Sequence, residues 1–204
     1  WHITPKNKSK NIVKRLSPSG FFLFLFLISF YTIRAQEWEK NADKKGIQVY
    51  TRLVKGNKLK DTKSVMTIHC SMDRFLKAQL DFPNYPTWVP KCSSAMLLKK
   101  ISDSECVYRC ILKIPMIQNR DLVVHLRLKR IDKDNCIIEL KGVPDFIPKD
   151  EDYIRMPRLV SSWTAKNLGG NKLHLVQVNS YDPGGKLPDF LINMAATTTP
   201  FESF

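Results

Sequence analysis

The sequence predicts an α+β fold in which a strongly curved antiparallel sheet wraps around a long C-terminal helix. β-type runs of alternating polarity recur between residues 46 and 181, and the short turns between them force neighbouring strands to be antiparallel. Apolar residues at helical spacing occur over 72–82 and again after residue 188. One face of such a sheet must be covered, and the last helix is the long apolar element that remains to cover it.

Residues 1–36 precede the predicted domain and have the composition of a secretory signal peptide. They contain six basic residues and no acidic ones, and the apolar run "FFLFLFLISFY" at 21–31 is followed by the small residue Ala35. A basic segment, an apolar stretch of about 7–15 residues and a small-residue cleavage site define such a peptide. A membrane span needs roughly 20 residues. We therefore expect cleavage near Ala35 and export to a periplasm or the exterior, with an uncleaved anchor as the alternative.

The remaining 37–204 suffices for one domain with a substantial core. Since the leader holds six basic residues and no acid, its loss lowers the net charge from +14 to about +8. Such a charge favours transient contact with an anionic membrane surface. Lys and Arg are dispersed beyond the leader, without a basic run or an aromatic–basic motif, so a nucleic acid partner is not expected. We expect a monomer.

The five cysteines predict neither a disulfide framework nor a zinc site. The spacing C-x-x-C is absent. Cys106 and Cys110 would lie on one strand, about 13 Å apart at the usual rise, which is too far for a bridge. Buried free thiols that act as small hydrophobic groups are expected. His69, His125 and His174 have no partner at a metal-binding spacing, so neither a metal nor a cofactor is expected.

Two strands and a helix open the predicted domain. The runs at 46–54 and 62–70 are strands separated by a Gly-Asn turn. Ser71 then caps a helix over 72–82. Its apolar residues recur at helical spacing, at Met72, Phe75, Leu76 and Leu80. The three prolines of the following "PNYPTWVP" break the chain.

The second half of the domain is predicted to be a meander that ends in a helix. Strands are expected at 95–101, 105–114, 121–131, 135–142, about 153–165 and 172–181. The segment "DPGGKLPDFLINMAATTTPF" is a turn followed by a helix, with Pro188 in the first turn, where a missing N–H does no harm. The helix is expected to continue beyond Phe204.

The alternation within these strands gathers apolar side chains on one face. Leu122, Val124 and Leu126 share a face from which His125 and Arg127 point away, and the neighbouring strands show the same division. Such a face either fills a solid core or lines a cavity. Periodicity does not separate these two alternatives.

Six motifs follow one another along the chain: "WEKNADKKGIQVYTR" (38–52), "FPNYPTWVP" (82–90), "CVYRCILKIPMIQNRDLV" (106–123), "GVPDFIPKDEDYIRM" (142–156), "SSW" (161–163) and "YDPGGKLPDFLINM" (181–194). Their identity, order and spacing resemble the START domain, the steroidogenic-acute-regulatory-related lipid transfer domain. The resemblance covers residues 37–204, so we expect one START-like lipid-binding domain there. It implies a helix-grip fold around a hydrophobic tunnel that holds one lipid-like molecule.

The tunnel and its gate are assigned from the alternation together with this resemblance. The predicted lining is Tyr108, Cys110, Leu112, Leu122, Val124, Leu126, Ile138, Leu140, Gln177, Asn179, Leu191, Met194 and Ala195. The gate is expected between the loop 143–152 and the last helix, at Phe146, Ile147, Gly184, Gly185 and Leu187. The two glycines supply a permissive hinge, and prolines flank the apolar loop tip.

Arg120 and Asp121 stand side by side where the chain enters the strand at 121–131. The pair is interpreted as a structural latch, an ion pair that fixes the passage from loop to strand. Adjacent residues on a strand point to opposite faces, which argues against joint action on one substrate atom. Asp121 is expected to accept hydrogen bonds at the rim of the sheet, and Arg120 to meet an acid from another loop.

These features predict a protein that binds, and transfers or senses, a lipid or another hydrophobic small molecule. No G-x-S-x-G elbow or phosphate loop occurs, and Cys110 has no evident neighbouring base, so an enzyme is not expected. One alternative is an aromatase/cyclase-like enzyme on the same fold, in which Tyr108, Gln177 or Asn179 polarises a polyketide-like substrate. The other is a ligand-free interaction module.

Overall fold

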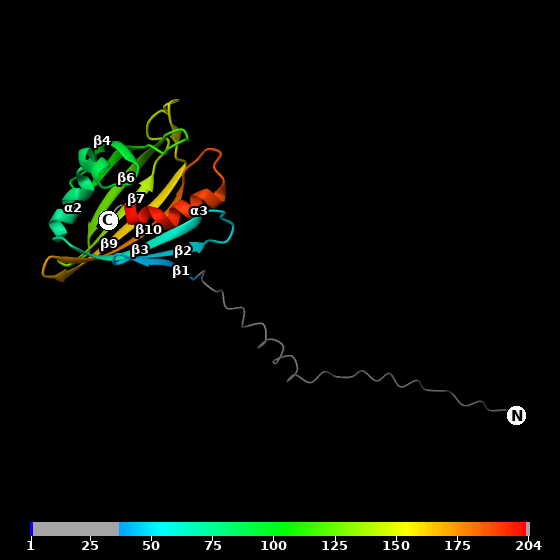
Figure 1. The fold of residues 1–204 in the computed structure, drawn as a ribbon, viewed down its shortest axis with the longest axis horizontal. Helices are drawn as coiled ribbons and strands as arrows, with labels where there is room; N and C mark the ends of the chain where they lie inside the picture. Colours follow the sequence, from blue (N-terminus) through cyan, green and yellow to red (C-terminus); the bar gives the residue numbers. More distant parts are fainter. Residues whose placement is uncertain (2–36, 203–204) are drawn as a thin grey trace. The chain divides into compact units, whose positions relative to one another are not determined.

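A ten-stranded sheet dominates the fold (Figure 1). The structure is a computed structural model that describes Trp1 and residues 37–202. The strands in this part of the chain are β1 (Glu39–Lys44), β2 (Ile47–Leu53), β3 (Lys60–His69), β4 (Cys92–Lys100), β5 (Glu105–Leu112), β6 (Arg120–Arg130), β7 (Asn135–Gly142), β8 (Ile154–Arg155), β9 (Arg158–Gly169) and β10 (Lys172–Asp182). The helices are α2 (Met72–Leu80) and α3 (Asp189–Thr198), with the 3-10 helices η1 (Phe82–Thr87) and η2 (Thr199–Glu202).

The order of strands across the sheet is β1-β2-β3-β10-β9-β7-β6-β5-β4. Neighbours along this path are antiparallel, while the short β8 pairs in parallel with the start of β6. The last strand lies beside the third, so the two ends of the domain belong to one sheet. The predicted α+β fold, a curved antiparallel sheet with a C-terminal helix, is confirmed.

Helix α2 covers one end of the inner face, which is the face of the sheet that packs against both helices. Ser71 caps the helix, because its hydroxyl accepts a hydrogen bond from the main-chain N–H of Arg74 at 3.3 Å. The ring of Phe75 meets that of Trp163 at a centroid distance of 6.0 Å. The sulfur atoms of Met72 and Cys136 lie 3.4 Å apart. This end of the inner face is therefore filled by side chains.

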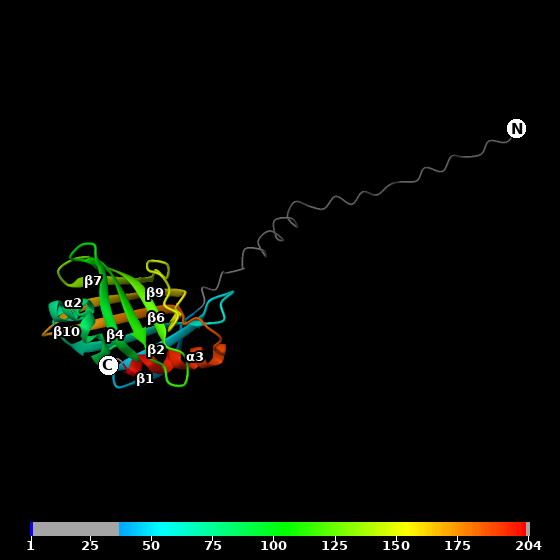
Figure 2. The ribbon, with the colours of Figure 1, turned by 90° about the horizontal axis from the view of Figure 1, so that it is seen from above.

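Helix α3 lies over the other end of the inner face. Asn193 ties it to the loop between β2 and β3: Oδ1 accepts from the main-chain N–H of Lys60 at 2.9 Å, and Nδ2 donates to the carbonyl of Lys58 at 3.1 Å. In η2, the carboxylate of Glu202 pairs with Lys91 Nζ at 3.0 Å, directly before β4. Seen from above, α3 is on the side of the domain opposite β7 and β9 (Figure 2).

Burial along the strands falls from the α2 end of the inner face to the α3 end. On β10, Leu175 is fully buried, whereas Gln177 and Asn179 are half-buried. On β7, Ile138 is fully buried and Leu140 is half-buried. The sheet thus forms a solid core beneath α2 and leaves inner-face side chains partly uncovered towards α3.

Three strand assignments differ from the sequence prediction. β1 escapes prediction because five of its six residues are exposed, so its sequence shows no apolar alternation. β4 begins at Cys92 instead of residue 95. The single strand expected over 153–165 is two strands, β8 and β9, because Pro157 lies between them and cannot donate to a strand ladder.

Candidate functional site

A group of neutral polar side chains lies on the inner face at its α3 end. Asn179 of β10 stands opposite Thr62 of β3 and Ser161 of β9. Gln177 stands opposite Ser64, one inward position nearer α2. Thr62, Ser64 and Ser161 are buried, and the two amides are half-buried. These five residues are called the polar group below.

The polar group contains a hydroxyl with unused hydrogen-bonding capacity. Ser161 Oγ donates to Asn179 Oδ1, whereas the buried Oγ of Ser64 has no partner within the described residues. A buried polar atom left without a partner costs roughly 1–3 kcal/mol. Gln177, which stands opposite, carries both a donor and an acceptor. The arrangement can therefore hydrogen-bond a hydroxyl or an amide of a ligand.

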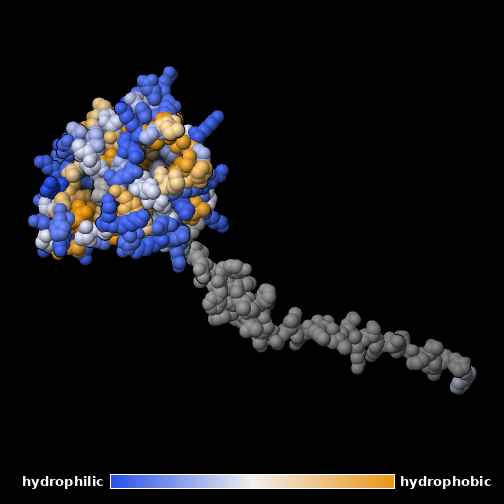
Figure 3. Space-filling model, viewed as in Figure 1, coloured by the Kyte–Doolittle hydropathy of each residue, from blue (hydrophilic) through white to orange (hydrophobic). Residues whose placement is uncertain are grey.

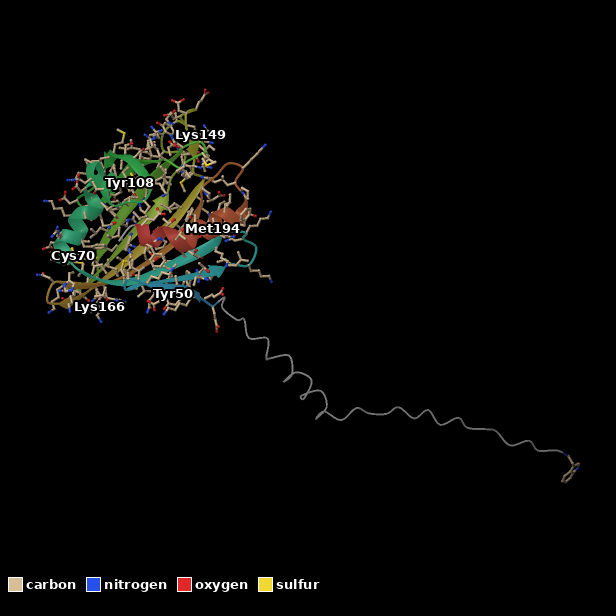
Figure 4. All side chains as sticks on the ribbon, in the orientation of Figure 1. Tyr50, Cys70, Tyr108, Lys149, Lys166 and Met194 are labelled. Atoms are coloured by element: carbon tan, nitrogen blue, oxygen red, sulfur yellow. The ribbon has the colours of Figure 1, made fainter. Side chains whose placement is uncertain are left out.

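The ten strand residues predicted to line a tunnel divide into two sets by depth. Six are buried in the core: Tyr108, Cys110, Leu122, Val124, Leu126 and Ile138. Four are half-buried: Leu112, Leu140, Gln177 and Asn179. Tyr108, labelled in Figure 4, illustrates the first set. Its ring stacks on that of Phe82 of η1 at a centroid distance of 4.7 Å. Only the half-buried set retains surface with which a ligand can make contact.

The helix residues predicted to line the tunnel are exposed. Leu191 and Met194 are 41% and 59% exposed and Ala195 is exposed as well, while Ala196 is only 4% exposed. Their place in the tunnel lining stays a prediction. The two hydrogen bonds of Asn193 turn its own side of α3 towards the β2–β3 loop, and successive helical residues are about 100° apart around the axis.

Asp121 is the centre of a buried ion-pair network. Its side chain is fully buried. Arg155 donates two hydrogen bonds to it in a bidentate arrangement, from Nε to Oδ1 at 2.9 Å and from Nη2 to Oδ2 at 2.8 Å. Arg109 adds bonds to Oδ2 at 3.1 Å and 3.0 Å. One carboxylate thus stands between two guanidinium groups. Bidentate, charge-assisted contacts of this kind are among the strongest hydrogen bonds in proteins.

Both arginines continue the network into the loop 143–152. Arg155 donates to three main-chain carbonyls of that loop, those of Pro144, Ile147 and Pro148. Arg109 Nη2 donates to Asp150 Oδ2 at 3.0 Å, and this hydrogen bond holds the pKa of Asp150 below its usual range. The loop predicted as one half of the gate is therefore fastened to Asp121 near both of its ends.

Arg120 is buried beside this network but has other partners. Its guanidinium donates to the carbonyls of Gln118 and Gly184, the latter at 3.5 Å, and burial lowers its pKa. The predictions of an Arg120–Asp121 ion pair and of an acid for Arg120 are therefore wrong. Adjacent strand residues point to opposite faces, so Asp121 meets Arg155 of β8 while Arg120 meets the turn after β10. The latch role of the two residues stays a prediction.

The predicted hinge, Gly184–Gly185, packs against the strand that leads out of the loop 143–152. Both glycines have left-handed backbone, with φ of +66° and +73°, which favours glycine. A Cβ on Gly185 would come within 2.9 Å of Ile154 Cδ1. The hinge that precedes α3 therefore contacts β8, which follows the loop 143–152, and the Arg120 side chain.

A pocket of about 330 Å³ opens beside the hinge. The β2–β3 loop, the hinge and the first turns of α3 form its walls, through Gly56, Asn57, Lys58, Leu59, Arg158, Asp182, Gly184, Gly185, Leu187, Asp189 and Ile192. Leu187, predicted as part of the gate, is thus placed at this opening. A movement of α3 about the hinge would change the width of the pocket.

The buried thiol and phenol of the inner face are not activated for catalysis. Cys110 lies beside Cys92, with 3.2 Å between the two sulfur atoms. The hydrogen bond to Cys92, together with burial, raises the pKa of Cys110, and burial raises that of Tyr108. The thiolate is the reactive form of cysteine, so a raised pKa disfavours a nucleophilic role for Cys110.

Neither a metal-binding cluster nor a membrane-spanning helix is found in the described part of the chain. No group of three or more His, Cys, Asp or Glu side chains is placed there to hold a metal ion. None of the helices found in that part of the chain has the length and apolarity that a membrane crossing requires.

Ser64, Arg109, Arg155 and Asn193 are among the residues of this region that were not predicted from the sequence. A signal existed for Arg109, because strand alternation puts it on the same face as Asp121 and the two strands are adjacent in sequence. Arg155 follows a long loop, and nothing local indicates its partner 34 residues away. Ser64 and Asn193 look like ordinary polar residues until their surroundings are known.

Residues 27–203 match the START domain, a span that begins inside the predicted leader. An uncharacterized protein of Pseudomonas aeruginosa is 27% identical over 169 residues, which cover 83% of this chain and 84% of that protein. The solved StAR-related lipid transfer protein of Xanthomonas axonopodis is 26% identical, with a TM-score of 0.76 over 81% of this chain and 93% of that one.

Human STARD10 has the same fold at 16% identity, with a TM-score of 0.70 over 92% of this chain and 77% of that one. The shared architecture is the curved antiparallel sheet with a C-terminal helix described above. Because the START match spans most of the sequence, and because solved members share this architecture, the chain belongs to the START domain family.

Proposed function

We propose that this protein carries one lipid molecule between the inner face of its sheet and α3. The observation that supports the proposal is the partly uncovered α3 end of the inner face, where Leu112, Leu140 and Leu159 are half-buried. Burial of apolar surface contributes about 25 cal/mol per Å², so an apolar ligand that completes this layer would bind favourably. The similarity to the StAR-related lipid transfer protein of Xanthomonas axonopodis supports this assignment.

The polar group indicates the chemistry of the ligand's polar end. Its hydroxyls and amides are neutral, so they supply hydrogen bonds without charge. A buried phosphate or carboxylate would need a cation for compensation, and the polar group itself contains none. We therefore propose a lipid whose polar end is a hydroxyl or an amide.

Native mass spectrometry of the purified chain tests the carrier function. The protein is expected to retain one lipid per chain, either from the host or after incubation with mixed vesicles. Extraction with organic solvent should then release a species that contains a hydroxyl or an amide and lacks phosphate. A chain that neither retains nor takes up any lipid would contradict the carrier function. Uptake of phospholipid alone would contradict the proposed headgroup chemistry.

Replacing Gln177 by Leu is expected to weaken retention of a hydroxyl- or amide-bearing lipid by about tenfold. One hydrogen bond to the ligand is lost, which corresponds to about 1–2 kcal/mol. Val178→Ala is the matched control, because this residue lies next in the same strand and points to the opposite face. Competition with a fluorescent lipid measures both. Equal retention in the two variants would contradict the role of Gln177.

Entry of the lipid requires a moving part, and we propose that the loop 143–152 and α3 form it. The Asp121 network holds the loop and Asn193 holds the helix, while β8, which follows the loop, contacts the glycine hinge that precedes the helix. Separation of α3 from the β2–β3 loop would widen the pocket beside the hinge.

Exposed apolar side chains near this gate suit a membrane surface. On α3, Phe190 is 68% exposed and Met194 59%, and Phe146 at the tip of the loop is 43% exposed. Hydrophobic residues (orange) are visible on the face that carries α3 (Figure 3). Side chains of this kind can insert among lipid headgroups, while the net positive charge favours anionic lipid. We propose a transient anionic membrane surface as a partner.

Replacing Phe190 and Met194 by Ser is expected to weaken binding to anionic vesicles by at least tenfold. Burying one such side chain in an apolar environment contributes about 1.5–3 kcal/mol, whereas exposed positions change protein stability by about 0.5 kcal/mol or less. Leu168→Ser, at an exposed position near the end of β9, is the control. Co-sedimentation with vesicles measures binding, and equal loss in both proteins would exclude a specific contact through α3.

The leader, predicted at 1–36, lies outside the described residues. We propose export of the domain with cleavage near Ala35, on the order of basic, apolar and small residues. N-terminal sequencing of the exported protein should begin near Gln36 or Glu37, and an intact N-terminus on cytoplasmic protein would contradict export.

A further inference from the structure

Cys92 and Cys110 bring two thiols into direct contact inside the domain. Their sulfur atoms are 3.2 Å apart, which is closer than the about 3.5–4.0 Å at which smaller carbon atoms pack without a bond. Cys92 stands opposite Leu112 and Cys110 stands opposite Ala95, so the cysteines are diagonal neighbours on adjacent strands. A β-bulge directly after Cys92 shifts the register of β4 and brings the diagonal pair together.

The other three cysteines have different surroundings. Cys136 Sγ contacts the thioether of Met72, and Cys70 Sγ donates to the carbonyl of Ser71. Cys106 lies on the same strand and the same face as Cys110, and burial raises its pKa. The close pair is therefore a local feature of the bulged end of β4.

We propose that Cys92 and Cys110 form a redox-active dithiol that closes to a disulfide between β4 and β5 under oxidising conditions. A disulfide has a sulfur–sulfur distance of about 2.05 Å, so closure requires an approach of only about 1.2 Å from the observed contact. Diagonal Cβ atoms on regular antiparallel strands are about 7–8 Å apart, too far for a disulfide, so the bulge after Cys92 accounts for the close approach of the two sulfurs.

The two sulfurs differ in a way that sets the order of reaction. Cys92 is the more exposed of the pair, and its pKa is lowered because the Cys110 thiol donates a hydrogen bond to it. With oxidised glutathione as oxidant, the Cys92 thiolate attacks one glutathione sulfur, forms a mixed disulfide and releases one glutathione thiolate. Cys110 then loses its proton and attacks Cys92 Sγ, which releases the second glutathione. Two protein thiols are oxidised and one glutathione disulfide is reduced to two thiols.

The disulfide would hold β4, the strand next to which η2 is anchored at the C-terminal end of the described chain. Lys91, which pairs with Glu202 of η2, immediately precedes Cys92. A covalent link between β4 and β5 restricts the unfolded chain and fixes the edge strand at this docking point. The oxidised form is expected to melt about 5–10 °C above the reduced form.

Refolding of the full domain in a glutathione redox buffer tests the proposal without reliance on access to the folded core. Reduced protein contains five thiols, and after refolding under oxidising conditions a thiol assay in denaturant should find three. Peptide mapping without reductant should find one link, between the peptides that contain Cys92 and Cys110. A full complement of thiols, or a link between any other cysteines, would overturn the proposal.

Two variants make the assignment specific. Cys106→Ser should still lose two thiols on oxidation, because this cysteine is outside the pair. Cys110→Ser should lose none and should melt at the same temperature with and without reductant. Loss of thiols in Cys110→Ser equal to that in the parent protein would overturn the pairing, even if the parent is oxidised.

Discussion

Replacing Asp121 by Asn is expected to lower the free energy of unfolding by about 3–5 kcal/mol. The carboxylate is fully buried between Arg155 and Arg109, and the side chain of Arg155 is only 3% exposed. The substitution keeps the shape of Asp121 but removes its charge, which leaves the buried guanidinium of Arg155 without an acid, whereas Arg109 keeps its contact with Asp150. Removing one member of a buried ion pair costs this much because the remaining charge is uncompensated.

Urea denaturation measures this effect, and Glu139→Gln is the matched control. Glu139 also pairs with a cation, Lys129, at 2.6 Å, but both side chains are more than 40% exposed. Exposed pairs typically contribute between 0 and 1 kcal/mol. A change below about 1 kcal/mol in Asp121→Asn, comparable with the control, would show that the network does not hold the fold together.

The contrast between Asp121 and Arg120 shows what adjacent charged residues reveal in a sequence. Their proximity suggests an ion pair, yet alternation sends the side chains to opposite faces. The carboxylate of Asp121 pairs with Arg155, which follows a long loop, whereas Arg120 donates hydrogen bonds to main-chain carbonyls. The latch role of the motif stays a prediction, and the partners of the two residues depend on the path of the loop 143–152, which no periodic pattern encodes.

The sheet was predictable for a related reason. Strands with one apolar and one polar face carry the period-2 pattern that identifies them, and short turns determine their antiparallel pairing. β1 lacks that pattern because it is exposed at the edge of the sheet. Alternation also identified the inner face, but it could not show that the face is packed beneath α2 and partly uncovered towards α3. That difference depends on where the two helices lie.

The rotation of α3 shows the same limit in a helix. Leu191 and Met194 form an apolar stripe in sequence, which favours a buried face. In the structure, Asn193 bonds to Lys58 and Lys60, Ala196 is buried, and Leu191 and Met194 are exposed. An apolar stripe on a helix is ambiguous between core and membrane contact, and the sequence alone does not distinguish them.

Replacing Asn193 by Leu is expected to accelerate lipid transfer between vesicles by about tenfold. The variant loses the hydrogen bonds to Lys60 N–H and the Lys58 carbonyl, each of which contributes about 1 kcal/mol or less at a partly exposed site. A loss of about 1.4 kcal/mol shifts an opening equilibrium tenfold. Thr197→Val is the control, because the hydroxyl of Thr197 bonds only within α3, to the carbonyl of Met194 at 2.8 Å.

Hydrogen exchange gives an independent view of the same opening. Main-chain amides of α3 should exchange faster in Asn193→Leu than in Thr197→Val, because local opening exposes them. Faster exchange with an unchanged rate of lipid transfer would mean that α3 opens but does not gate the ligand. Unchanged exchange would mean that the Asn193 contacts do not hold the helix.

Combining Asn193→Leu with Asp150→Asn tests whether the loop 143–152 and α3 open in one motion or in two separate motions. Asp150 is partly exposed and holds the loop 143–152 through Arg109, so its replacement should loosen the loop with little loss of global stability. Effects of independent sites add, whereas sites that act on one element couple. If loop and helix open together about the contact of Ile154 with the glycine hinge, the double variant should transfer lipid at a rate that departs from the product of the two single effects. A simple product would instead assign them to separate motions.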